Sequence, residues 1–293
     1  MKLGIHNLLS LNVRGLGNGI KRRGLFHWLK KYHNGKNSII FLQETHSTPE
    51  IETLWKKEYA SNILFSHGKS NCRGVAILLP KDTELNVVNV ISSPTGRYIA
   101  MEISLENESF LFLNVYAPTR DHPNEQVTFM EDLFKVTERY AHCSLLVGGD
   151  MNMCLDPSLD KHGEPDKSSK YRNHIKEYCD HFNIIDIWRV QNPDTRRYTW
   201  RQSNPLRQSR IDYFFISTHL LYNISQTDIA PSYKSDHSLI VIKFIDISAE
   251  GRGPGYWKFN NLLLQDEVYI DYIKGWLLEY DKMYSYIEDK SLL

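Results

Sequence analysis

The chain has 293 residues, of which 41% are hydrophobic, and its 35 basic and 35 acidic side chains give no net charge. This length and composition are typical of a soluble globular protein with one large domain or two ordinary ones, and the balanced charge argues against a strongly basic nucleic-acid-binding protein. Polar residues interrupt the apolar N-terminus, and no apolar run is long enough to span a membrane. We therefore expect an intracellular protein with no signal peptide and no membrane partner.

Short β-rich runs alternate with helical patterns along the first 248 residues. The patterns predict strands at 3–13, 38–44, 74–79, 84–91, 98–105, 110–116, 144–150, 209–217 and 238–244, and helices at 20–32, 49–59, 123–140 and 167–182. Many strands with helices between them favour an α/β fold with two packed sheets covered by helices on the outside.

The last part of the chain differs in composition. Glycine and proline at 249–255 predict a linker, and residues 262–290 have the apolar periodicity of a helix. We therefore divide the chain into residues 1–248, one domain, and residues 249–293, a linker and a helical extension that we expect to pack on a further part of a larger protein.

The four cysteines are Cys72, Cys143, Cys154 and Cys179, and their spacing shows no paired motif. Most lie in or beside apolar segments, as buried reduced thiols do inside the cell. We expect no disulfide and no zinc.

One predicted strand ends in two glycines followed by an acid and an amide. The apolar run 145–147 leads into Gly148 and Gly149, and then Asp150 and Asn152 follow. Two residues apart in an extended segment, the acid and the amide project to the same side, while the glycines allow a sharp turn and close approach of a ligand. Taken alone, the segment fits an Asx-turn as well as a catalytic site.

Other predicted strands also end in polar residues that suit phosphate chemistry. They are Asn12, Glu44, Asn114, Tyr116, Asp212 and the tripeptide Ser235-Asp236-His237. Acids at apolar strand ends are uncommon unless they are paired or bind metal, because burying an unpaired charge is costly. Phosphodiester hydrolysis needs a water nucleophile and a cation, and carboxylate oxygens such as those of Glu44 suit magnesium. Neighbours in a strand point to opposite faces, so an acid from another strand is expected to orient His237.

These motifs, in this order, resemble the exonuclease-endonuclease-phosphatase superfamily, and more narrowly the N-terminal endonuclease domain of LINE-type non-LTR retrotransposon polyproteins. The segments that carry the resemblance are 11–16, 43–46, 73–78, 114–118, 149–152, 209–213 and 235–238. Residues 253–260 are similar to the stretch that leads toward the reverse transcriptase in those polyproteins. The resemblance implies a four-layer α/β sandwich that uses Mg²⁺, with Mn²⁺ as a substitute, to nick double-stranded DNA in the nucleus. The 3′-hydroxyl left behind would prime reverse transcription of the element's RNA.

The resemblance also implies a role for individual residues. Glu44 would be the principal metal ligand, with Asn12 beside it. Asp150 would orient or deprotonate the attacking water, and Asn152 would hold the scissile phosphate. His237, oriented by Asp212, would stabilise the developing charge, Asp236 would assist near the metal, and Tyr116 would lie by the leaving oxygen. Thr199 and Ser235 would add hydrogen bonds to phosphate, although such side chains also pair readily with local backbone.

DNA contacts are expected from basic side chains around this site. Residues 201–208 form a predicted turn that could enter a groove, where Arg201 or Arg207 would hold phosphates; a solvated hairpin tip is the alternative. Arg14 and the predicted N-terminal helix, with Arg22 and Arg23, could contact the DNA backbone further along, or simply form a solvated face. Two other functions remain open: an abasic-site repair endonuclease or another phosphoesterase of the superfamily, and an inactive nucleic-acid-binding module.

Overall fold

The structure, a computed structural model, describes residues 5–33, 37–69, 72–81, 85–105, 108–163, 170–245 and 265–283. It comprises two compact units, residues 1–247 and residues 248–293. The second unit contains α7 (Glu267–Met283), which lies within the helix predicted at 262–290. The predicted linker at 249–255 lies outside the described residues. No helix in the described part of the chain is long and apolar enough to cross a membrane.

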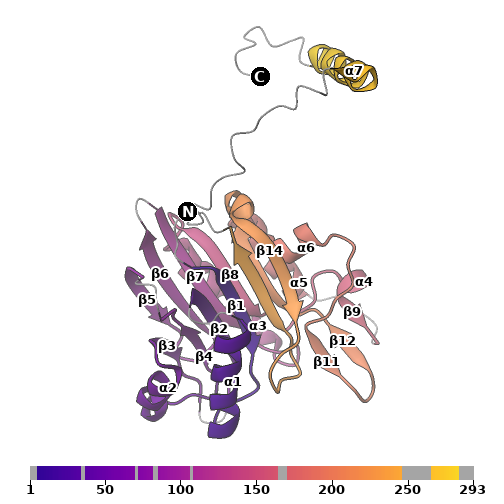
Figure 1. Cartoon of the computed structure of the whole chain (residues 1–293). Helices are drawn as coiled ribbons and strands as arrows, with labels where there is room; N and C mark the ends of the chain where they lie inside the picture. Colours follow the sequence, from indigo (N-terminus) through magenta and orange to yellow (C-terminus); the bar gives the residue numbers. More distant parts are fainter. Residues whose placement is uncertain are drawn as a thin grey trace. The chain divides into compact units, whose positions relative to one another are not determined.

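The first unit contains a six-stranded sheet with the strand order β14-β15-β1-β2-β4-β3 (Figure 1). The strands are Asn7–Asn12 (β1), Ser38–Gln43 (β2), Ile63–Ser66 (β3), Val75–Leu78 (β4), Ile224–Ala230 (β14) and Leu239–Phe244 (β15). β1 and β2 run parallel, whereas the other neighbours are antiparallel. Helices α1 (Gly19–Tyr32) and α2 (Glu52–Tyr59) pack on the outer face of this sheet through an apolar core that includes Phe26, Trp55 and Leu42.

A second six-stranded sheet has the order β10-β13-β8-β7-β6-β5. Its strands are Val87–Ser92 (β5), Tyr98–Leu105 (β6), Glu108–Tyr116 (β7), Ser144–Asp150 (β8), Ile184–Asp186 (β10) and Asp212–Ser217 (β13). Here β7 and β8 run parallel. Helices α3 (Pro123–Glu138) and α5 (Lys170–His181) cover the outer face through a core that includes Leu133, Tyr178 and Leu113.

The two sheets face each other across a third apolar core. Phe41 and Ile77 from the first sheet lie in one cluster with Phe112, Leu146 and Phe214 from the second. Two mixed sheets packed face to face, each covered by helices, give the four-layer α/β sandwich, so the predicted fold class is confirmed.

Several elements differ from the sequence prediction. The strand predicted at 209–217 is divided: β12 (Arg207–Ser209) belongs to a third, three-stranded sheet with β9 (Lys161–His162) and β11 (Trp200–Gln202), whereas β13 begins at Asp212. The pattern also missed β3, β10 and β14, and the short helices α4 (Pro157–Asp160) and α6 (Ile187–Gln191). β14 lies at a sheet edge and its sequence, ISQTDIA, is half polar, so it lacks the apolar run used to find the other strands.

Candidate active site

The polar strand ends converge because each sheet contains one parallel pair of strands. Asn12 and Gln43 are register partners at the carboxyl ends of β1 and β2, and Tyr116 and Asp150 are partners at the ends of β7 and β8. Carboxyl ends of parallel strands meet at one edge of a sheet, where ligands bind in many α/β proteins. Asp212, at the start of antiparallel β13, lies directly opposite Asp150. The packing of the two sheets therefore brings these residues to one place.

A cavity of about 790 Å³ opens at this edge. Its predicted catalytic or metal-binding lining residues are Glu44, Tyr116, Asp150, Asn152, Asp236 and His237. Arg14 and Arg207, which the sequence suggested for phosphate binding, also line it. Further basic residues that the sequence analysis did not single out line the same cavity: Arg120, Lys161, Lys170 and Arg172.

Gly148 and Gly149 allow β8 to reach the cavity between its neighbours. Gly149 has φ +138°, and a Cβ there would lie 2.0 Å from the Val115 carbonyl oxygen. A Cβ on Gly148 would lie 2.3 Å from the Phe214 ring. Larger side chains at these two positions would push β8 away from β7 or from the Phe214 ring, and would displace Asp150 with it.

Asp150 is buried, with 1% of its surface exposed, and hydrogen bonds hold both of its oxygens. The Asn12 side-chain nitrogen donates to Asp150 Oδ2 at 2.9 Å and to Glu44 Oε1 at 2.8 Å, while the Asn152 backbone N–H donates to Asp150 Oδ1 at 2.8 Å. Burial and the nearby Asp212 carboxylate raise the pKa of Asp150 to about 7, although His237 and the hydrogen bonds oppose this. A carboxyl group with this pKa exchanges a proton near neutral pH.

His237 lies between two aspartates. Its Nδ1 donates to Asp212 Oδ2 at 2.9 Å, and its Nε2 lies 3.9 Å from Asp150 Oδ2. The predicted orienting acid on another strand is thus Asp212. Burial opposes charging of the ring, but the Asp212, Asp150 and Asp236 carboxylates outweigh it and raise the pKa of His237 to about 10. The ring is therefore an imidazolium at neutral pH.

The residues at the mouth of the site fit a hard divalent cation. Glu44 is half-buried and lines the cavity, and Asp236 Oδ1 is buried without a hydrogen-bond partner. A buried carboxylate oxygen that lacks a donor is costly unless a cation compensates it. Asp150, Asp212 and His237 also place ligand atoms within 4.8 Å of one another, and this group could hold a metal only if the His237 imidazolium lost a proton. Carboxylate oxygens are the ligands that magnesium prefers.

Asn12 is not oriented as the expected metal ligand. Its side-chain oxygen accepts the Arg14 backbone N–H at 3.0 Å, so the nitrogen, which cannot bind a cation, faces Glu44 and Asp150. Asn12 instead aligns the two carboxylates. Tyr116 is also close to Glu44, to which its hydroxyl donates, and burial followed by the Glu44 and Asp150 charges raises the pKa of Tyr116. It stays a neutral hydrogen-bond donor.

Three predicted phosphate contacts are corrected by the structure. Arg22 is buried, donates to Glu58 at 2.6 Å and lies over the Trp55 ring, so it holds α1 against α2 and cannot reach DNA. Thr199 is fully buried, and its hydroxyl oxygen accepts the backbone N–H groups of Ile211 and Asp212.

The third correction concerns Ser235, whose hydroxyl donates to the Asn12 carbonyl at 2.7 Å and accepts the His237 N–H. Its hydrogen is therefore used to tie the 235–237 loop to β1. Thr199 and Ser235 therefore support Asp212 and His237 through the backbone, because backbone groups engage both hydroxyls.

The other basic residues predicted to contact DNA are compatible with that role. The side chain of Arg14 is 69% exposed and lies 3.5 Å from Asp236 Oδ2. Arg23 is 60% exposed beside Glu58, and exposed Arg201 donates to the Ser238 hydroxyl from β11. Their contact with DNA remains a prediction.

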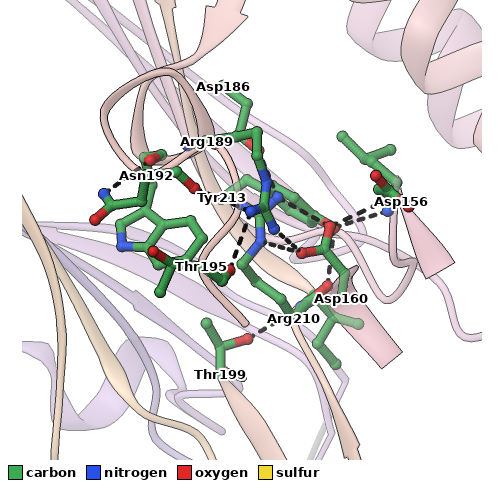
Figure 2. Close-up of polar contacts among 12 residues, drawn as sticks. Asp156, Asp160, Asp186, Arg189, Asn192, Thr195, Thr199, Arg210 and Tyr213 are labelled. Atoms are coloured by element: carbon green, nitrogen blue, oxygen red, sulfur yellow. Dashed lines mark hydrogen bonds and ion pairs between the residues drawn. The ribbon is translucent and has the colours of Figure 1, made fainter. Parts of the chain in front are cut away.

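The sequence analysis missed a buried charge network around Arg210, two residues before Asp212 in the chain (Figure 2). Arg210 donates to both oxygens of Asp160, at 2.8 and 2.9 Å, and lies 2.7 Å from Asp186, while Arg189 donates to the same Asp160 carboxylate. The Arg210 guanidinium also lies 4.5 Å from the Tyr213 ring centroid. Figure 2 shows Arg189 and Arg210 converging on Asp160. The available signal was an arginine two residues before Asp212, inside a segment predicted as one strand.

These features define a hydrolytic type of site, with an acid, an acid-oriented imidazolium and carboxylates around one cavity. The sequence of residues 7–237 matches the endonuclease/exonuclease/phosphatase family, and the chain belongs to that family. It is 31% identical over 277 residues to an uncharacterised 149 kDa protein of transposon TX1 from Xenopus laevis. The match covers 92% of this chain but 21% of that relative, so the chain spans about a fifth of the relative's length.

Solved structures share the fold. The AP endonuclease LMAP from Leishmania major superposes with a TM-score of 0.68 at 15% identity, over 82% of this chain and 87% of that one. The catalytic domain of APE2 from Xenopus laevis gives 0.66 at 18% identity, over 81% and 91%. The 3′ phosphatase NExo from Neisseria, bound to a product DNA hairpin, gives 0.60 at 19% identity, over 82% and 99%. At these identities the likeness establishes the fold alone.

Proposed function

We propose that this chain is the magnesium-dependent DNA endonuclease of a LINE-type retrotransposon. It would nick double-stranded DNA and leave a 3′-hydroxyl that primes reverse transcription of the element's RNA by a reverse transcriptase elsewhere in the same polyprotein, in the nucleus. The carrying observation is the arrangement of Asp150 and the Asp212–His237 pair on one cavity. The similarity to a transposon protein over 92% of the chain supports the element-encoded role.

The residues of the site divide the chemistry between them. Asp150, with a pKa of about 7, accepts a proton from the attacking water and holds that water in line with phosphorus. The His237 imidazolium donates to a phosphate oxygen as charge accumulates, and Asp212 keeps the ring oriented and charged. The Asn152 amide donates one hydrogen to the Ala117 carbonyl at 2.8 Å and has a second N–H for the phosphate. The neutral Tyr116 hydroxyl, which donates to Glu44 in the metal-free chain, would donate to the phosphate once Glu44 holds the cation.

A divalent cation would be held by Glu44 and Asp236. When bound, it would neutralise phosphate charge and stabilise the leaving oxygen. Arg14, Arg201 and Arg207 would then hold the flanking phosphates, giving contacts that are salt-sensitive but not sequence-specific.

A plasmid-nicking assay tests the proposal. Supercoiled plasmid is incubated with purified protein and magnesium, and the nick ends are mapped chemically; 3′-hydroxyl and 5′-phosphate ends are expected. Asp150→Ala and His237→Ala should lose nicking, whereas the control variant His181→Ala, at an exposed histidine paired with Glu138, should retain it. Equal nicking by all the variants would contradict the assignment.

The same assay separates the competing functions. A strong preference for abasic over intact duplex would favour a repair endonuclease instead. DNA binding without any nicking, in magnesium or manganese, would favour an inactive nucleic-acid-binding module.

A further inference from the structure

A second group of metal-binding side chains lies at the opposite end of the second sheet. Glu102 on β6 meets His142 and Cys143, which occupy the turn between α3 and β8. One ligand atom from each lies within 4.8 Å of the others: Glu102 Oε1 is 3.3 Å from His142 Nε2 and 4.0 Å from Cys143 Sγ. These residues play no part in the site described above, which lies at the other end of β8.

The two distances from Glu102 Oε1 are close to those of a tetrahedral zinc site. Zinc bonds to nitrogen, oxygen and sulfur of about 2.0–2.3 Å place neighbouring ligand atoms about 3.3–3.8 Å apart. The separations at Glu102 need adjustments of only a few tenths of an ångström. Zinc accepts mixed carboxylate, imidazole and thiolate ligands, whereas magnesium and calcium do not bind thiolate well.

The surroundings also suit a bound cation. Glu102 and Cys143 are buried, with 9% and 7% of their surfaces exposed, while the His142 side chain is 60% exposed and provides a route for the ion. In the metal-free chain the Cys143 thiol donates to Glu102, and burial and that carboxylate raise its pKa to about 11. Zinc binding would release this proton to solvent, and the Cys143 thiolate and the Glu102 carboxylate together would neutralise the dication. The turn is fixed by backbone hydrogen bonds, among them Cys143 N–H to the Tyr140 carbonyl at 2.8 Å, so two of the ligands are already positioned.

We propose that Glu102, His142 and Cys143 bind a zinc ion with a fourth position open to solvent. The site would link β6 to the start of β8, and it is independent of the nuclease function. The absence of paired cysteines led us to expect no zinc. The sequence does not reveal this site because Glu102 and His142 are separated by 40 residues and meet only through the pairing of β6 with β7 and of β7 with β8.

Cobalt(II) spectroscopy tests the site in the intact chain. Cobalt is added to metal-free protein in excess magnesium, which occupies the carboxylate site; a thiolate-to-cobalt charge-transfer band and strong tetrahedral visible bands are expected. Zinc should displace the cobalt. The control Cys179→Ser, at a half-buried cysteine on α5, should keep the band, and Cys143→Ser should lose it.

Variants of the other two ligands test the zinc site independently if Cys143→Ser does not fold. His142→Ala, at an exposed turn, and Glu102→Gln should each weaken zinc binding by about 100-fold or more, since even partners outside the ligand set contribute 10–100-fold. Absence of the thiolate band from the wild-type chain, or zinc affinities unchanged in both variants, would overturn the proposal. Unchanged plasmid nicking by His142→Ala is expected and shows that the two sites are separate.

Discussion

Two clusters of buried charge in the described part of the chain, one around Arg210 and one around Asp150, are built in opposite ways. Around Arg210, two guanidinium groups meet the carboxylates of Asp160 and Asp186, and Asp160 is fully buried with its oxygens paired. Around Asp150, carboxylates outnumber cations: His237 is the buried cation among Asp150, Asp212 and Asp236, and a buried Asp236 oxygen lacks a donor. In the Arg210 cluster, the compensated network, opposite charges balance and stabilise the fold. In the Asp150 cluster, the uncompensated network, the rest of the fold keeps excess negative charge together, and this excess can bind a cation and, through it, a phosphate.

The two clusters are joined at Asp212. Arg210 fixes the start of the segment, Thr199 accepts the Asp212 N–H, and Asp212 orients His237. The compensated network thus positions the uncompensated one. Four predictions test this division, in order of decreasing effect.

The largest effect is expected from Asp212→Asn. Loss of the carboxylate removes the largest attraction that raises the pKa of His237, so that pKa falls, although the Asp150 and Asp236 carboxylates still raise it. Nicking should fall about 10³-fold. In the wild type, stability from His237 is fully present below its ordinary pKa of 6.5 and is lost as the pH rises through about 10. In the variant that loss should occur at lower pH. Histidine-ring NMR titration measures the shift, and an unchanged His237 titration would refute the pairing.

Breaking the compensated network should primarily affect folding. Arg210→Met leaves Asp160 with less compensation in the interior and should lower the free energy of unfolding by about 3–5 kcal/mol. The control Lys56→Met removes an exposed partner of Glu52, at 3.2 Å, and should cost less than about 1 kcal/mol. Urea unfolding measures both. Equal costs would show that the buried network contributes no more than a surface pair.

Asp150→Asn should change how stability depends on pH in the metal-free chain. The pKa of Asp150 is raised from 3.8 to about 7, so the folded state binds this proton more tightly and the wild type loses stability as the pH rises through that window. The variant lacks this loss. Its free energy of unfolding relative to the wild type should therefore increase by about 1 kcal/mol for each pH unit within the window. Urea unfolding in chelator at several pH values measures it, and parallel curves would contradict the raised pKa.

The smallest effect is expected from Thr199→Val. It leaves the buried Asp212 N–H and the part-buried Ile211 N–H without an acceptor, and should cost about 1–3 kcal/mol in stability. Nicking should fall about 10-fold through a smaller kcat, with KM little changed, and the His237 ring signals should shift. Thr199→Ser restores the oxygen and should restore all three. A loss of stability with normal kcat and normal ring signals would make Thr199 purely structural.

The sequence alone determined which strands end in candidate site residues. The apolar runs before Asn12, Glu44, Tyr116 and Asp150 predict buried strands, since continuous apolar segments bounded by polar residues have few other stable environments. The two glycines before Asp150 predict a sharp turn that a ligand can approach, whereas the close contacts that require them, with Val115 of β7 and Phe214 of β13, are tertiary. These patterns predict two packed sheets covered by helices, and the resemblance of the motifs in their order added the family and the four-layer sandwich.

Only the tertiary structure decided which polar groups face the cavity and which serve the backbone. Arg22 and Arg23 are neighbours in a basic run, yet α2 buries the first and leaves the second exposed. Thr199 and Asp212 are far apart in sequence but share a hydrogen bond, and Glu102 meets Cys143 only through strand pairing. Such contacts depend on the directions of side chains across layers, and one-dimensional periodicity carries no information about which layer lies opposite.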